Sequence, residues 1–116
     1  MAPEHPPLPV LFYRTTTGVE PVRKWLRELA PSDRRIVGRD LYSVQLEWPV
    51  GMPLCRSLGG GLWELRSHLE NNRIAGILFF LYGGSIGVVH GFIKKTRAIP
   101  QDDLDLARKR TKEMLR

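Results

Sequence analysis

Cysteine and acidic side chains are scarce in this chain of 116 residues, which has one cysteine and 12 Asp and Glu against 18 Lys and Arg. The lone Cys55 excludes an internal disulfide and a cysteine-based zinc site, and we expect it to be a small buried apolar residue. Such cysteine usage fits a reducing cytoplasm, where we place the protein. The net charge of +6 favours an acidic partner such as nucleic acid.

Signals for export, membrane insertion and phosphate loops are also missing. Residues 1–9 have neither the basic nor the apolar region of a secretion signal, so we expect a flexible lead-in before a single domain over residues 10–116. The uncharged residues 74–93 could span a bilayer by length, but the central Gly83-Gly84-Ser85 favours two strands and a turn. Gly59-Gly60-Gly61 lacks the Lys-Ser/Thr and strand-to-helix context of a phosphate loop, so we expect a hairpin turn.

The first half of the chain contains signals for one strand and two helices. A strand is expected at residues 10–13, a helix from Pro21, and a second helix capped by Ser32 after Pro31 ends the first. Asp33 suits the positive end of the second helix. Apolar stripes predict that the helices form an antiparallel pair on a sheet; the stripes comprise Val22, Trp25, Leu26 and Leu29, then Val37, Leu41, Val44 and Trp48.

The second half predicts strands at residues 54–58, 62–69, 73–82 and 85–94, and a last helix after Pro100. The fold class is therefore α+β, with a small, mostly antiparallel sheet packed by two N-terminal helices, plus a C-terminal helix. Alternation in the second of these strands places Glu64, Arg66 and His68 on one face, which we expect to be open, while the intervening residues pack on the helices.

Positive charge concentrates on the predicted sheet. Residues 54–99 carry 6 basic and 2 acidic side chains, a net +4, whereas residues 1–53 and 100–116 carry a net +1 each. Cations on a rigid β-surface suit a polyanion and can be held accurately enough for phosphate chemistry.

Three stretches of the sheet resemble the phage-derived HigB-like branch of the RelE/ParE toxin superfamily, with the expected helices around them. They are Leu58-Gly59-Gly60-Gly61-Leu62-Trp63-Glu64-Leu65-Arg66, Arg73-Ile74, and His90-Gly91-Phe92-Ile93-Lys94-Lys95-Thr96. The resemblance covers residues 10–115. It implies a RelE-like fold and a type II toxin that cleaves mRNA on the ribosome. It also implies a protein antitoxin, commonly a helix-turn-helix DNA-binding protein similar to HigA, with operator DNA bound only through the toxin–antitoxin complex.

Cleavage of this kind has the ribose 2′-OH attack the adjacent phosphate, so the site must move protons and stabilise a phosphorane. Arg66 and Arg73 are candidate phosphate clamps, because a guanidinium offers a planar fork to two oxygens. His90 is a candidate acid or base, and Lys94 shares its strand parity. No carboxylate–histidine cluster suggests a metal site, so we expect no metal or cofactor. The candidate RNA-binding residues are Arg56, His68, Lys95 and Arg97.

Structural roles compete with each of these assignments. Arg66 can pair with Glu64 or Glu70, Arg56 can form a salt bridge, and His90 can be a core histidine. The C-terminal helix, which lacks the tyrosine of some RelE toxins, can be a solvated helix, a nucleic-acid contact or an antitoxin dock. The alternative functions are a ParE-like inhibitor of DNA gyrase and a non-catalytic phage module that binds nucleic acid.

Overall fold

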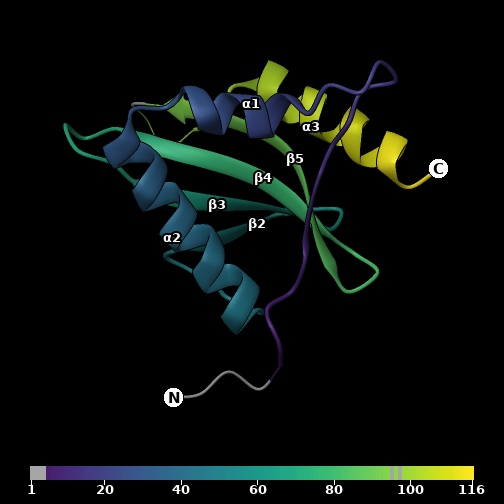
Figure 1. Cartoon of the computed structure of the whole chain (residues 1–116), viewed down its shortest axis with the longest axis horizontal. Helices are drawn as coiled ribbons and strands as arrows, with labels where there is room; N and C mark the ends of the chain where they lie inside the picture. Colours follow the sequence, from purple (N-terminus) through teal and green to yellow (C-terminus); the bar gives the residue numbers. More distant parts are fainter. Residues whose placement is uncertain (1–4, 95, 97) are drawn as a thin grey trace.

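The computed structural model describes residues 5–94, 96 and 98–116, and within them a five-stranded mixed sheet is flanked by three helices (Figure 1). The sheet order is β1-β5-β4-β3-β2, with β1 parallel to β5 and the other neighbours antiparallel. The α+β class and the mostly antiparallel sheet are confirmed. The elements are β1 (Val10–Phe12), α1 (Pro21–Glu28), α2 (Pro31–Glu47), β2 (Cys55–Gly59), β3 (Leu62–His68), β4 (Ile74–Tyr82), β5 (Ser85–Lys94) and α3 (Gln101–Met114).

Prolines set the start of both N-terminal helices. Pro21 opens α1 as predicted, because a residue without an N–H loses nothing in the first turn. Pro31 opens α2 for the same reason, so the prediction that Ser32 caps this helix is wrong. Ala30 occupies the cap position and its side chain makes no capping hydrogen bond. Asp33 lies in the first turn of α2, as expected.

The two helices cover different strands and do not form the antiparallel pair predicted from the sequence. They diverge from their short connection, with α1 packed on β5 and α2 on β3 (Figure 1). The apolar stripe of each helix therefore packs on a different part of the sheet. Trp48, after α2, meets Trp63 edge to face with ring centroids 4.9 Å apart, and it meets Phe79 at 5.4 Å. The buried centre of this layer consists of Val22, Val37, Val44, Leu65, Ile77, Phe79, Ile86 and Val88.

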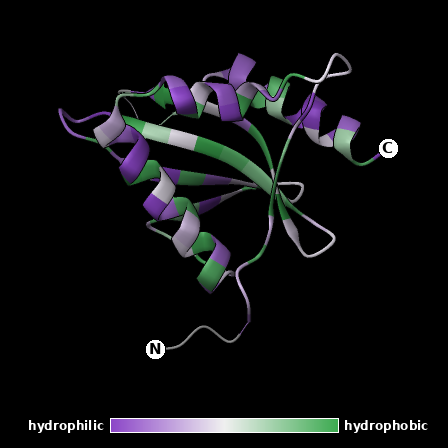
Figure 2. Ribbon diagram, viewed as in Figure 1, coloured by the Kyte–Doolittle hydropathy of each residue, from purple (hydrophilic) through white to green (hydrophobic). Residues whose placement is uncertain are grey.

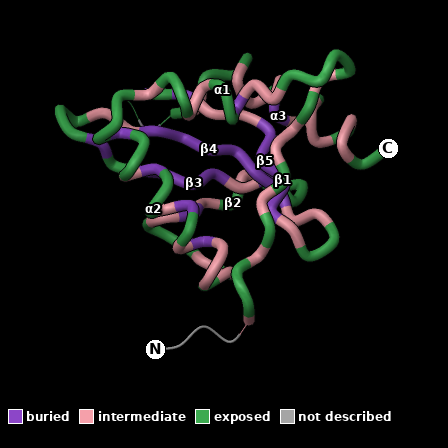
Figure 3. The backbone as a smooth tube through the Cα atoms, in the orientation of Figure 1, coloured by how far each residue is buried: buried purple, intermediate pink, exposed green. Residues whose placement is uncertain are grey.

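On the opposite face of the sheet α3 packs on β5 and β4, and the prediction that Glu64 and Arg66 lie on an open face is wrong. Glu64 is 0% and Arg66 is 7% exposed, and of the three residues assigned to this face only His68 is exposed. Figure 2 shows β4 as hydrophobic along most of its length, and Figure 3 shows it as buried. A central strand with apolar residues on both faces needs a layer on each side. The second layer consists of Leu62, Leu78, Phe80, Val89, Phe92 and Ala107.

The uncharged run over residues 74–93 forms the β4–β5 hairpin. It turns at Gly83 and Gly84, whose φ values of 55° and 84° suit residues without a side chain. In the part of the chain that the structure describes, no helix has the length and apolar character needed to cross a bilayer.

The segment ahead of β1 contacts the end of α2 along residues 5–8. The backbone N–H of Leu8 donates to the Gln45 carbonyl at 2.9 Å, and the Gln45 side chain returns a bond to the Leu8 carbonyl at 2.8 Å. The His5 ring lies 3.1 Å from the Trp48 carbonyl oxygen. These contacts tie the described part of the expected lead-in to the domain.

Candidate nucleic-acid interface

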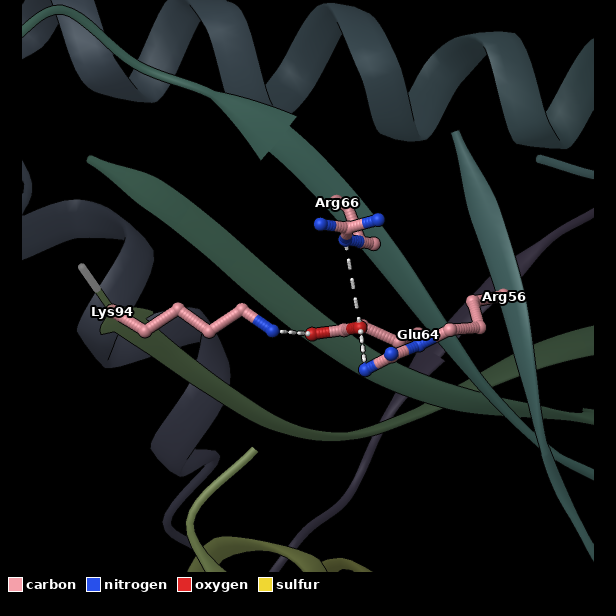
Figure 4. Close-up of polar contacts among 4 residues, drawn as sticks. All are labelled: Arg56, Glu64, Arg66 and Lys94. Carbon is pink, nitrogen blue, oxygen red and sulfur yellow. Dashed lines mark hydrogen bonds and ion pairs between the residues drawn. The ribbon is translucent and has the colours of Figure 1, made fainter. Parts of the chain in front are cut away.

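A fully buried carboxylate on β3 gathers three cationic side chains from three strands (Figure 4). Arg56 Nη2 donates to Glu64 Oε1 at 2.9 Å, and Lys94 Nζ donates to Oε2 at 2.6 Å. Arg66 Nε lies 3.8 Å from Oε1. Lys94 and Arg56 approach the carboxylate from opposite sides and Arg66 from a third direction. We call these four residues the Glu64 cluster.

The register of the sheet explains how side chains distant in sequence meet. Arg56 lies directly opposite Glu64 in the β2–β3 pair, and Arg66 lies opposite Gly76 in the β3–β4 pair. A Cβ at Gly76 would lie 3.1 Å from Glu64 Oε2 and 3.0 Å from Phe92 Cζ. The missing side chain leaves room for the carboxylate of β3 to reach the ammonium of β5 across β4.

Burial makes the charges of this cluster strongly interdependent. An isolated carboxylate in the interior is very unfavourable, and it persists there only with charged or hydrogen-bonded partners. Three cations and one carboxylate leave the Glu64 cluster with a formal charge of +2. Arg66 and Lys94 are themselves only 7% and 6% exposed. Among the described residues, Arg66 Nε has no hydrogen-bond acceptor.

Arg66 reaches the surface at an open pocket of about 450 Å³ beside the β3–β4 turn. His68 and Arg73 line the same pocket, and Met52, Pro53, Leu69, Asn72 and Ile74 complete it. A neighbouring pocket of about 210 Å³ also contains Arg66 and His68 in its wall. We call the larger one the Arg66 pocket. It combines two guanidinium groups, an imidazole and apolar side chains, which are the groups that bind phosphate and nucleobases.

Arg73 is held by the first turn of α2. Its Nη1 and Nη2 donate to the two carboxylate oxygens of Asp33 at 2.9 and 3.0 Å, and its Nε donates to the Glu70 carbonyl at 3.2 Å. The hydrogen bond to Asp33 raises the pKa of Arg73. Asp33 is 5% exposed. The sequence pointed to Asp33 only as a helix-terminal charge, so its role in holding Arg73 was missed.

His90 lies apart from the Arg66 pocket, although it has the strand parity of Lys94. Its Nε2 is 2.6 Å from Asp103 Oδ1 in α3, and Arg110 Nη1 lies 3.5 Å from its Nδ1. Its ring stacks on Phe92, with centroids 5.5 Å apart. These contacts make His90 part of the seam between β5 and α3.

Two basic residues of α3 bind backbone carbonyls of β2 and of β5. Arg108 donates to the carbonyls of Leu58 and Gly59 at 3.1 and 3.3 Å, and Arg110 donates to that of Val89 at 2.9 Å. Tyr13 donates its hydroxyl to Glu113, and this bond raises the pKa of Tyr13. Two arginines of α3 thus fasten the helix to the sheet.

The structure therefore divides the residues predicted from the sequence. Arg56, Arg66 and Lys94 meet at Glu64, while Arg66, His68 and Arg73 meet at the Arg66 pocket. Lys95 and Arg97 lie outside the described residues. The sequence suggested Glu64 only as a structural partner of Arg66, a pair that the structure contains, and missed its contacts with Arg56 and Lys94. The available signal was a single acid in an otherwise apolar stretch of strand.

No group of three or more His, Cys, Asp or Glu side chains that could hold a metal ion occurs within residues 5–94, 96 and 98–116. Cys55 is buried and free, as predicted, and burial together with the charge of Asp40 raises its pKa to about 12.

Comparison with known proteins gives one family match. The family model described as "Phage derived protein Gp49-like (DUF891)" matches residues 24–112, which include both N-terminal helices apart from the first turn of α1, β2 to β5 and most of α3. No curated protein matches the chain.

Proposed function

Since the chain belongs to the phage-derived Gp49-like family, which is RelE-like and toxin-like, we propose that it is the toxin of a type II toxin–antitoxin pair, of the HigB-like kind. In this proposal it is an endoribonuclease that cleaves mRNA on the ribosome. A helix-turn-helix antitoxin neutralises it, and operator DNA is bound only through the toxin–antitoxin complex.

The observation that carries the proposal is the meeting of Arg66, His68 and Arg73 at one open pocket, with Lys94 linked to Arg66 through Glu64. A phosphodiester carries a negative charge that grows as the phosphorane forms, so cations fixed beforehand stabilise the transition state more than the ground state. Cations held on β-strands are well suited to this because the sheet keeps their geometry.

The pocket supplies cations for the phosphorane and one group for proton transfer. Arg66, which lines the pocket, binds the scissile phosphate, and Lys94 adds positive charge through the Glu64 cluster. His68 is exposed at the pocket and can take the 2′-OH proton or protonate the leaving 5′-oxygen. We therefore assign to His68 the proton transfer that the sequence suggested for His90, because His90 is engaged by Asp103 beneath α3.

Arg73 contributes to phosphate binding from the rim of the pocket. A guanidinium has five N–H groups, of which Asp33 and Glu70 accept three. The remaining two can reach a phosphate oxygen. The bidentate bond to Asp33 holds the guanidinium in one orientation. A guanidinium held in this way should bind phosphate better than that of a mobile surface arginine.

The proposal is tested by inducing the chain in bacteria and mapping mRNA 5′ ends. Growth arrest with new cuts inside translated codons is expected for the wild type, and both are lost in Arg66→Ala. Lys24→Ala, which removes an exposed cation from α1, is the matched control and should arrest growth like the wild type.

Two other outcomes would contradict the proposal. Arrest with broken chromosomes and intact messages would indicate a gyrase poison of the ParE kind. No arrest, together with retained binding of RNA, would indicate a non-catalytic nucleic-acid-binding module.

A further inference from the structure

We infer that Glu64 is a positioning residue, which holds Arg66 and Lys94 in the arrangement that binds a phosphodiester at the Arg66 pocket. This inference rests on the proposed function, because it concerns the same site. It adds a role for an acidic residue that is not part of the lining of the Arg66 pocket and is 0% exposed.

The contacts of Glu64 exclude a simpler role as the base of the reaction. Oε2 accepts from Lys94 at 2.6 Å, while Oε1 accepts from Arg56 at 2.9 Å and lies 3.8 Å from Arg66 Nε. Both oxygens face cations and the side chain is 0% exposed, so neither oxygen can contact a proton of a substrate in the pocket. A buried group between the cations and distant from solvent can act on a substrate only through those cations.

The arrangement needs a carboxylate because its cations are buried close together. Arg66 and Lys94 are each more than nine-tenths buried, and like charges repel strongly where water is excluded. A single anion between them offsets this repulsion and specifies the direction in which each side chain points. Gly76 leaves the space for this contact, since a Cβ there would lie 3.1 Å from Glu64 Oε2.

Net charge and positioning predict opposite results when Glu64 is replaced. If the carboxylate only reduces the positive charge of the site, removing it should strengthen the binding of an anion. If it positions the cations, removing it should weaken binding, although the site becomes more positive. This opposition makes the inference testable without a cleavage assay.

The experiment measures the binding of inorganic phosphate and of a dinucleotide, UpA with a 2′-O-methyl group that blocks cleavage, by calorimetry and NMR titration. Two variants separate the effect of the carboxylate charge from the effect of side-chain length. Glu64→Gln keeps the shape and loses the charge, and Glu64→Asp keeps the charge and shortens the side chain. Both are expected to weaken dinucleotide binding about tenfold, because a charge-assisted network loses its geometry. Glu28→Gln removes an exposed acid of α1 and should leave binding within about twofold of the wild type.

Tighter binding by Glu64→Gln, or unchanged binding by Glu64→Asp, would overturn the inference. So would a wild-type protein that binds neither probe. Phosphate binding that depends on Glu64, in a protein that makes no cuts on the ribosome, would refute the proposed cleavage and leave the positioning role intact. Ribosomal cleavage by the wild type, with variants that bind as the wild type does, would refute the positioning role alone.

Folding of the variants is followed by thermal melting, because an uncompensated buried cation can unfold the chain. If Glu64→Gln folds poorly, the same substitution is made in the Lys94→Gln background, where an amide pair replaces the charged pair. There it should still weaken binding about threefold relative to Lys94→Gln alone, because Arg66 loses its neighbouring charge. Equal binding by the two chains would contradict the inference.

Discussion

Asp33 and Arg73, 40 residues apart, join the first turn of α2 to the turn between β3 and β4 by two parallel hydrogen bonds of 2.9 and 3.0 Å. The contact links the helical layer to the rim of the Arg66 pocket. It makes one wall of the proposed site dependent on a helix that contributes no residue to the lining of that pocket.

We predict that Asp33→Asn and Arg73→Lys each lower the melting temperature by a few degrees, because neither retains the bidentate pair. Circular dichroism melts measure this. Ser32→Ala is the control, since this neighbouring side chain makes no cap, and its melting temperature should change by about 1 °C or less. An unchanged melting temperature in Asp33→Asn would show that the pair does not stabilise the turn.

The two histidines should respond differently to substitution by glutamine. His68→Gln is expected to lower ribosomal cleavage about 100-fold with little change in stability, because His68 is exposed at the pocket. His90→Gln should lower the melting temperature and leave cleavage per folded molecule close to that of the wild type, because His90 contacts Asp103. Primer extension on cleaved messages and thermal melting measure the two effects. The reverse pattern would return the proton-transfer role to His90.

Alanine should have opposite effects at two glycines. Gly76→Ala is expected to destabilise the fold by about 1–3 kcal/mol, because the new methyl group meets the Phe92 ring at 3.0 Å and Glu64 at 3.1 Å. Gly38→Ala should stabilise α2 by about 0.5–1 kcal/mol, since this helical position is exposed and nothing lies within 4 Å of the new carbon. Urea denaturation gives both values. A neutral Gly76→Ala would show that the Glu64 cluster tolerates a side chain there.

Cys55 should make stability fall at alkaline pH. Burial and, secondarily, Asp40 raise its pKa in the folded state to about 12 from an ordinary value of 9.0. Between these values the unfolded chain loses the thiol proton and the folded chain keeps it, so the free energy of unfolding decreases as pH rises. Urea denaturation at about pH 8 and about pH 10.5, chosen on either side of the ordinary thiol pKa, should show a smaller loss for Cys55→Ala. Equal losses in the two chains would contradict the raised pKa.

Much of the secondary structure could be predicted because its signals are local. The glycine turn and the β-branched residues after it gave β5 its observed bounds, and Pro21 marked the start of α1. The wrong prediction that Ser32 caps α2 has a local cause too. Pro31 and Ser32 are both acceptable at a helix start, and only the path of the backbone selects one.

The candidate site could be predicted only in part. Alternation along β3 correctly places Glu64, Arg66 and His68 on one face, but the period of a strand carries no information about what covers that face. The positions of His90 and Arg73 depend on α3 and α2, which pack on the strands from distant parts of the chain.

The amino-acid sequence by itself determined the order of helices and strands, the concentration of positive charge on the sheet and the alternation of side chains along β3, since these follow from neighbouring residues. Tertiary structure alone decided that Arg56, Arg66 and Lys94 meet one buried carboxylate and that His68 lies at the pocket. The physical reason is that interstrand register and helix packing join residues far apart in the chain, and burial then makes their charges depend on one another.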